Sequence, residues 1–190
     1  MKTLIETDYV DAAKLLGCEI EVIKAISQIE APKGGFNDDG TPVTLFEGHW
    51  FHRFTSGKFD VEYPYISYPK WTRKWYGKDQ IGEKERLDKA CELDRTSALM
   101  SASWGKFQIM GFNFGICGFK TIQKFVNAMY KSESQHLMAF CNYIKNSGLI
   151  GSLTNLDWET FAYLYNGPEY KKNRYAERLY KTYMRLLEKK

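Results

Sequence analysis

Residues 20–30 read IEVIKAISQIE, and this stretch organises the expected fold around one buried helix. Its isoleucines recur at helical spacing, so one stripe of the helix should face a core: Ile20, Ile23, Ile26 and Ile29. Pro32 cannot continue the helix and biases the residue before it away from helical geometry. The pattern therefore places Glu30 on the last turn of the helix, directly before a non-helical segment that opens beside it.

Glu30 is an unusual residue for that position, because the C-terminal end of a helix favours cations. A carboxyl group beside a helix C-terminus and apolar walls should keep its proton, since both surroundings disfavour the charge. A carboxylic acid that stays protonated near neutral pH can serve as a general acid. The alternative is a solvated residue at the end of a helix, and the helix alone favours that alternative.

Composition indicates a folded globular protein. The chain has 190 residues, which predicts a single domain over residues 1–190. Hydrophobic residues make up 44% and aromatic residues 16%, and this argues against disorder. The 13 Tyr and 5 Trp suit either a core or a groove that holds flat, hydroxyl-rich ligands.

Cysteine usage and the first residues indicate a reducing compartment and a soluble protein. Four cysteines lie in apolar or helical segments without a C-x-x-C pair, so we expect free thiols and neither disulfides nor a zinc site: Cys18, Cys91, Cys117 and Cys141. Residues 1–8 carry acids where a secretion signal needs an apolar run. No segment approaches the roughly 20 apolar residues that span a bilayer.

The chain reads as mainly α with a small β or irregular lobe, an α+β arrangement. The irregular lobe is expected between residues 36 and 80, where Asp39-Gly40 is a hairpin candidate and residues 45–54 fit either a strand or a short helix. Thr7 or Asp8 could cap the first helix. The helices are expected over residues 9–16, 20–30, 83–100, 121–129, 133–147, 157–165 and 170–187.

Two later segments carry polar residues that could line a cleft. Residues 101–111 read SASWGKFQIMG, in which the chain turns at Gly105 and Gln108 presents an amide that could bind an acetamido or hydroxyl group. The alternative is a tight junction between helices. Residues 161–168 read FAYLYNGP and put Tyr165 and Asn166 on a last helical turn, where Asn also serves as an ordinary cap.

Taken together, the three segments resemble the lysozyme superfamily. An early helix-ending glutamate, an S-x-x-W-G-x-F-Q-I-M segment and an A-x-x-Y-N-G segment occur in the same order in goose-type lysozymes and soluble lytic transglycosylases. The sequence is more similar to the N-acetylmuramidase domain of bacteriophage endolysins, through residues 45–51 and 98–111. The resemblance runs from about residue 10 to the end. It implies a lysozyme-like fold with a helical lobe and a small lobe on either side of a cleft.

The resemblance also implies roles for individual residues. Glu30 matches the proton donor. Ser101 and Gln108 lie where the superfamily lines the sugar cleft beside that acid. Tyr165 and Asn166 match the motif that touches the substrate and the catalytic carboxyl.

Glycoside hydrolysis usually needs a second carboxylate. Glu47 is the leading candidate, although it could instead pair with Arg53 or His52 and hold the small lobe together. Weaker candidates lie in loops: Asp38, Asp39, Asp60 and Glu62. We expect no metal and no cofactor, because His49 and His52 have no third ligand in a recognisable zinc pattern.

The expected function is hydrolysis of the β-1,4 bond between N-acetylmuramic acid and N-acetylglucosamine in peptidoglycan, as in an endolysin that lyses a bacterial host. One alternative is a lytic transglycosylase, which gives 1,6-anhydro products. Another is a non-catalytic phage protein that binds the cell wall. The protein is expected to be made in the host cytoplasm without a signal peptide and to reach the wall by a separate route.

The expected partner is the glycan strand, bound by a monomer, with no nucleic acid. After Pro168, eight Lys and Arg face three Glu, although the formal net charge of the whole chain is only +4. The basic C-terminal helix could therefore contact the anionic envelope. A solvated helix face is the alternative reading of this run.

Overall fold

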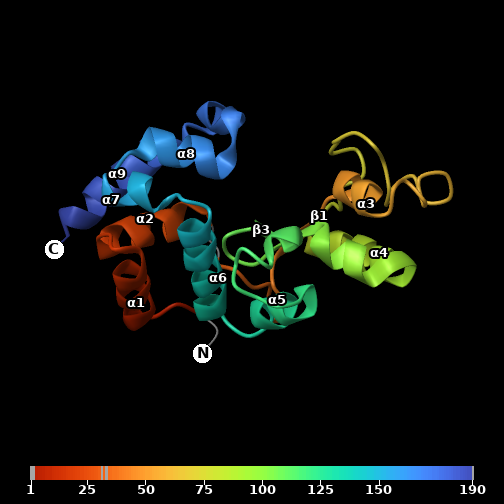
Figure 1. Cartoon of the computed structure of the whole chain (residues 1–190), viewed down its shortest axis with the longest axis horizontal. Coiled ribbons are helices and arrows are strands. Elements are labelled where there is room, and N and C mark those ends of the chain that lie inside the picture. The colour runs from red at the N-terminus through yellow and green to blue at the C-terminus, as the bar shows by residue number, and fades with distance from the viewer. Residues whose placement is uncertain (1–2, 31, 33, 190) are drawn as a thin grey trace.

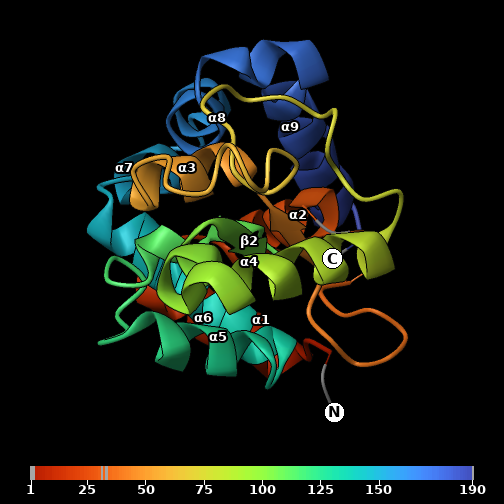
Figure 2. The same cartoon turned by 90° about the vertical axis from the view of Figure 1, so that its right-hand side faces the viewer.

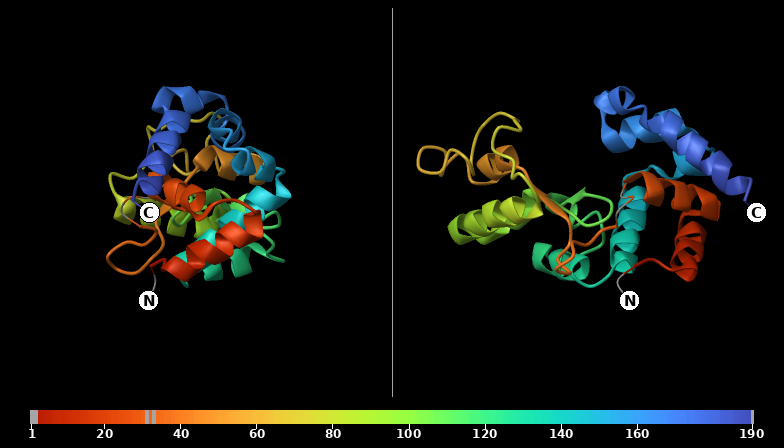
Figure 3. Two further views of the ribbon diagram at one scale, coloured as in Figure 1. Left: turned by 90° about the vertical axis from the view of Figure 1, so that its left-hand side faces the viewer. Right: turned by 180° about the vertical axis from the view of Figure 1, so that it is seen from behind.

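The computed structural model describes residues 3–30, 32 and 34–189. It is mainly helical with one small sheet, which confirms the predicted fold class. Figures 1 and 3 show α1 (Glu6–Leu16), α2 (Ile20–Glu30) and the C-terminal helices at one end of the molecule, and α3 (Gly48–Phe54) and α4 (Gln80–Met100) at the other. The remaining helices are α5 (Ile122–Met129), α6 (Glu133–Asn146), α7 (Ile150–Thr154), α8 (Trp158–Asn166) and α9 (Tyr175–Leu187), with short 3-10 helices η1 (Gly111–Asn113) and η2 (Pro168–Asn173).

Helix α2 is buried along the predicted stripe. Ile23 and Ile26 are fully buried, and the helix packs against α1 and α9. Burial of such side chains stabilises the fold by about 1.5–3 kcal/mol each. Because α9 crosses α2, a residue more than 140 positions away in the sequence lies beside the end of α2.

The sheet joins two segments that are distant in sequence. Strand β1 (Thr44–Phe46) pairs antiparallel with β2 (Ala102–Trp104), which pairs antiparallel with β3 (Ile109–Met110). Phe46 lies opposite Ala102, and Ser103 opposite Met110. The SASWGKFQIMG segment is therefore a β-hairpin, where the sequence predicted only a turn.

Several predicted element boundaries were wrong. Helix α1 begins at Glu6, and Asp8 acts inside it, where its carboxylate accepts the Ile5 N–H at 2.9 Å, so neither Thr7 nor Asp8 is the cap. Residues 45–54 combine both alternatives, with β1 followed directly by α3. The last helix starts at Tyr175 rather than 170, because Arg174 adopts left-handed geometry with φ of 50°.

Loop 55–79 connects α3 to α4 without regular secondary structure and falls within the irregular lobe predicted between residues 36 and 80. Figure 2 shows it running above α4 and descending to the start of that helix. None of the helices in the described part of the chain is long and apolar enough to cross a bilayer.

Candidate active site

Glu30 is held at the end of α2 by a residue of α9. The Tyr175 hydroxyl donates a hydrogen bond to Glu30 Oε1. Asn166, the last residue of α8, lies close enough to lower the pKa of Tyr175, although burial raises that pKa overall. Helices α2, α8 and α9 thus bring two polar side chains to one carboxyl group.

Burial raises the pKa of Glu30 above its ordinary value of 4.5. The hydrogen bond from Tyr175 and the positive charge of Arg178 lower the pKa by smaller amounts, because both favour the ionised form. The net direction agrees with the prediction from the sequence. The site therefore keeps a carboxylic acid protonated to higher pH than water would, which is the property a proton donor needs.

Glu30 lines two cavities, and no other described residue lines both. The narrower cavity, of about 250 Å³, lies against β3 and α8 and is lined by Phe107, Gln108, Ile109, Met110, Asn113, Tyr143, Tyr165 and Asn166. The wider cavity, of about 930 Å³, lies between the segment after α2 and the start of α4. Its wall includes Phe36, Asp38, Asp39, Val43, Gln80 and Ile81. The carboxyl group thus lies where a ligand that filled both cavities would pass.

Gln108 lies in the wall of the narrower cavity, but its amide is already engaged inside the protein. Its nitrogen donates to the carbonyls of Gly105 at 2.8 Å and Val43 at 3.3 Å, and its oxygen accepts from the Ser103 hydroxyl at 2.8 Å. Its φ of 47° is in the left-handed region. These bonds fix the turn between β2 and β3, so Gln108 shapes the cavity wall.

Ser101 lies outside both cavities. It is fully buried, and its hydroxyl donates to the Ser97 carbonyl at 2.7 Å, back along α4. The expectation that Ser101 lines the cleft was wrong, because the residue ends a helix and its side chain satisfies that helix. The hydroxyl that contacts the cavity wall belongs to Ser103.

Tyr165 and Asn166 lie in the narrower cavity as α8 ends. The Tyr165 hydroxyl donates to the Phe107 carbonyl at 3.1 Å, and its ring stacks on Phe161. Burial raises the pKa of Tyr165, and the nearby Glu30 carboxyl adds to the effect. Sequence reasoning did not find Tyr175, because nothing in the local pattern around it distinguishes this tyrosine from a core residue of the last helix.

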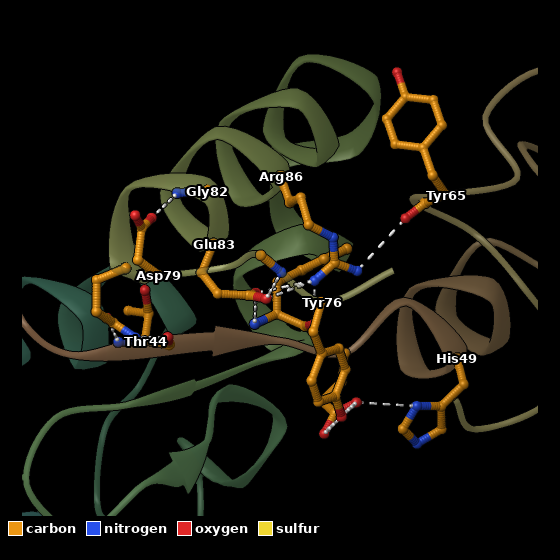
Figure 4. Close-up of polar contacts among 12 residues, drawn as sticks. Thr44, His49, Tyr65, Tyr76, Asp79, Gly82, Glu83 and Arg86 are labelled. Carbon is orange, nitrogen blue, oxygen red and sulfur yellow. Dashed lines mark hydrogen bonds and ion pairs between the residues drawn. The ribbon is translucent and has the colours of Figure 1, made fainter. Parts of the chain in front are cut away.

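Glu47 lies between β1 and α3, outside the two cavities that Glu30 lines. Its two polar contacts, Tyr76 and His49, are labelled in Figure 4. The Tyr76 hydroxyl is 2.8 Å from both carboxylate oxygens, and His49 Nδ1 is 3.3 Å from Oε2. Burial raises the pKa of Glu47 above 4.5.

The alternative pairing of Glu47 with Arg53 or His52 was wrong. The Arg53 guanidinium lies over the Trp50 ring, 4.9 Å from its centroid, and His52 Nδ1 lies 2.7 Å from Asp60. Within the described ranges, no three His, Cys, Asp or Glu side chains gather in a way that could hold a metal ion.

Comparison with known proteins relates the chain to one family and to one solved structure. Residues 19–187 match the family described as N-acetylmuramidase. Among solved structures, the chain is similar to the one titled "Crystal structure of Burkholderia AP3 phage endolysin", with a TM-score of 0.90 and 33% identity over 97% of this chain and 70% of that chain. A comparison with curated proteins finds no significant match. On the family match and the structural similarity together, the chain belongs to the N-acetylmuramidase family of peptidoglycan hydrolases.

Proposed function

We propose that this domain cleaves the β-1,4 bond between N-acetylmuramic acid and N-acetylglucosamine, with Glu30 as the general acid. The observation that carries the proposal is the position of Glu30 as the residue common to two cavities. A glycan strand that occupies both cavities has a bridging oxygen beside the carboxyl group. Glu30 then donates its proton to that oxygen as the bond to the sugar breaks.

The surroundings of Glu30 support this role chemically. Tyr175 fixes the carboxyl by donating to Oε1, which leaves the second oxygen to carry the proton. After proton transfer, the same hydrogen bond stabilises the new carboxylate, because a hydroxyl donor favours the ionised form. Tyr175 is thus a positioning residue that helps the acid in its charged state.

The second half of the reaction needs a base for the attacking water or a group that stabilises the sugar cation. Asp38 and Asp39 share the wider cavity with Glu30. The hydrogen bonds from Thr41 lower the pKa of Asp39, so it stays ionised. We therefore propose Asp38 or Asp39, rather than Glu47, for this step, because Glu47 lies outside both cavities.

The proposal is tested with purified bacterial walls. Glu30→Gln is expected to lower the rate of clearance of a wall suspension by at least about a hundredfold, the usual contribution of a positioned acid. Circular dichroism should stay unchanged, since Gln is isosteric. A Glu30→Gln protein that clears walls at the wild-type rate would remove Glu30 from the chemistry. A wild-type protein that binds walls without clearing them would support the non-catalytic alternative.

Product analysis separates hydrolysis from the lytic transglycosylase reaction. That alternative needs only one acid/base group, and it is favoured if neither Asp38 nor Asp39 contributes. Hydrolysis adds one water to each cleaved bond, whereas the transglycosylase leaves a 1,6-anhydro sugar without added water. Mass spectrometry of borohydride-reduced fragments distinguishes these products. It also shows whether muramic acid is the new reducing end, as the proposal requires.

The basic C-terminal helix offers less positive charge to the wall than its sequence indicates. Glu177 on α9 pairs with Arg174 and Lys181, both at 2.6 Å, so part of the positive charge is neutralised on the helix itself. We propose that the two cavities, more than this helix, provide affinity for the wall.

A further inference from the structure

Residues 70–78 form an exposed, positively charged and aromatic segment. The sequence KWTRKWYGK contains four cations and no acid, and all four cations are exposed: Lys70, Arg73, Lys74 and Lys78. Trp71 is 59% exposed. Trp71 thus presents an apolar ring face with a polar edge to solvent, beside four positive charges.

Tyr76 ties residues 70–78 to a half-buried carboxyl group. Its hydroxyl donates to Glu47, and its backbone N–H donates to the Arg73 carbonyl at 3.1 Å. His49 approaches the same carboxyl from the other side. The loop thus has an internal support for a ring that remains largely in solvent.

The backbone of the segment is fixed as well. The Gly77 N–H donates to the carboxylate of Glu83, which is buried in α4 and paired with Arg86 at 2.9 Å (Figure 4). A Cβ on Gly77 would lie 2.5 Å from the Glu83 backbone nitrogen, so the close approach requires glycine. Ordering an exposed loop costs conformational entropy. Such order suits a surface prepared for a ligand.

The segment leads directly into the wall of the wider cavity. Lys78 is followed by Asp79, Gln80 and Ile81, which line that cavity together with Glu30. Figure 2 shows the loop descending to this end of α4. A polymer that leaves the wider cavity along this side meets residues 70–78.

Both the aromatic ring and the charges match a glycan that carries peptides. The C–H faces of pyranose rings pack on exposed indole rings, which combine an apolar face with a polar edge. The peptide stems on muramic acid carry free carboxylates, which pair with guanidinium and ammonium groups. The Arg73 guanidinium lies 5.7 Å from the Trp71 ring centroid, so charge and ring form one patch.

We propose that residues 70–78 bind a peptide-bearing muramic acid unit beyond the cleavage site, with Trp71 under the sugar ring and Arg73 and Lys74 at the stem carboxylates. This inference rests on the proposed function. It makes Glu47 and Tyr76 positioning residues for the loop. The enzyme should then prefer stem-bearing strands over glycan from which an amidase has removed the peptides.

The test compares kcat/KM on intact peptidoglycan with kcat/KM on amidase-stripped glycan. Arg73→Gln with Lys74→Gln is expected to lower the value on intact peptidoglycan about three- to tenfold, the scale of two surface ion pairs, and to leave the value on stripped glycan unchanged. Trp71→Ala should raise KM on both substrates. Lys120→Gln with Lys124→Gln, the same charge change on exposed residues at α5, is the matched control.

Binding measurements keep this test independent of the catalytic proposal. In a Glu30→Gln background, cosedimentation with intact walls should weaken when Arg73 and Lys74 are replaced, whether or not Glu30 is the acid. Equal losses on intact and stripped glycan would overturn the assignment to peptide stems. So would binding to vesicles containing phosphatidylglycerol that depends on Arg73 and Lys74 while wall binding does not.

The role of Glu47 is tested in the same assays. Tyr76→Phe and Glu47→Gln are expected to raise KM severalfold with kcat preserved at saturating substrate, because they release the Tyr76 anchor of residues 70–78 without touching the reacting bond. The KM of the Trp71→Phe variant should lie between those of the wild type and the Trp71→Ala variant, because phenylalanine keeps an aromatic face. A kcat of the Glu47→Gln variant that is two orders of magnitude below the wild-type value, with KM unchanged, would overturn this role.

Discussion

At the scale of single residues, burial and the Tyr175 hydrogen bond act in opposite directions on the pKa of Glu30. The Tyr175 hydrogen bond lowers that pKa against the larger effect of burial. Tyr175→Phe should therefore raise the pKa of Glu30, and the alkaline limb of kcat/KM should move up by about one pH unit, the size of one hydrogen bond. The pH profile measures this directly. Tyr180→Phe, an exposed tyrosine of the same helix, is the control, and a limb that moves down would contradict the argument.

A second residue-scale prediction concerns stability. Glu30 ionises near 4.5 in the unfolded chain and at higher pH in the folded protein, because burial raises its pKa. As pH rises from below 4.5 through the folded pKa, charging Glu30 lowers the free energy of unfolding of the wild type. Glu30→Gln has no such loss, so it should gain on the wild type as pH rises. Urea titrations from pH 4 to 8 test this, and parallel stability curves would show that Glu30 is not perturbed.

Sequence reasoning found only the part of the site that local patterns mark. Glu30 could be predicted because a helical stripe, a proline and an acid occur together within a few residues. Tyr175 could not, since its role depends on how α9 crosses α2. Ser101 was misplaced because the motif gives its position in the chain but not the direction of its side chain, which turns back to Ser97.

At the scale of elements, α4 anchors the small lobe through a buried ion pair. Glu83 accepts the Phe46 N–H at 3.1 Å, and Arg86 donates to the Phe46 carbonyl at 3.1 Å, so both backbone groups at the end of β1 depend on this pair. Helices with regular apolar spacing could be predicted. The short strands could not, because β2 and β3 contain five residues in total and exist through pairing with β1.

Breaking the pair from one side is expected to be costly. Arg86→Met leaves the buried Glu83 carboxylate without its cation and should lower the free energy of unfolding by about 3–5 kcal/mol. Adding Glu83→Gln should restore part of the loss, because it removes the buried charge and its amide oxygen still accepts one of the two backbone N–H groups, from Phe46 or Gly77. Guanidinium denaturation measures both variants. A double variant less stable than Arg86→Met alone would contradict this account.

At the scale of the whole molecule, one contiguous core joins the helical end to the small lobe. Buried residues of the same cluster include Ile26 in α2, Phe46 in β1 and Phe161 in α8. A shared core predicts a single cooperative unfolding transition, because neither end can lose its packing while the other keeps it. Tryptophan fluorescence weights the small lobe, since three of the five tryptophans lie there, Trp50, Trp71 and Trp75, while most of the helix content lies elsewhere. Fluorescence and far-ultraviolet circular dichroism should give the same denaturant midpoint.

Phe46→Ala truncates a fully buried core side chain and is expected to lower the free energy of unfolding by about 3–5 kcal/mol, so it should lower both midpoints together. Separate midpoints, or a Phe46→Ala variant that shifts the fluorescence transition alone, would mean that the two ends unfold independently. In that case the start of α4, which lines the wider cavity together with Glu30, could move away while the other helices stay folded.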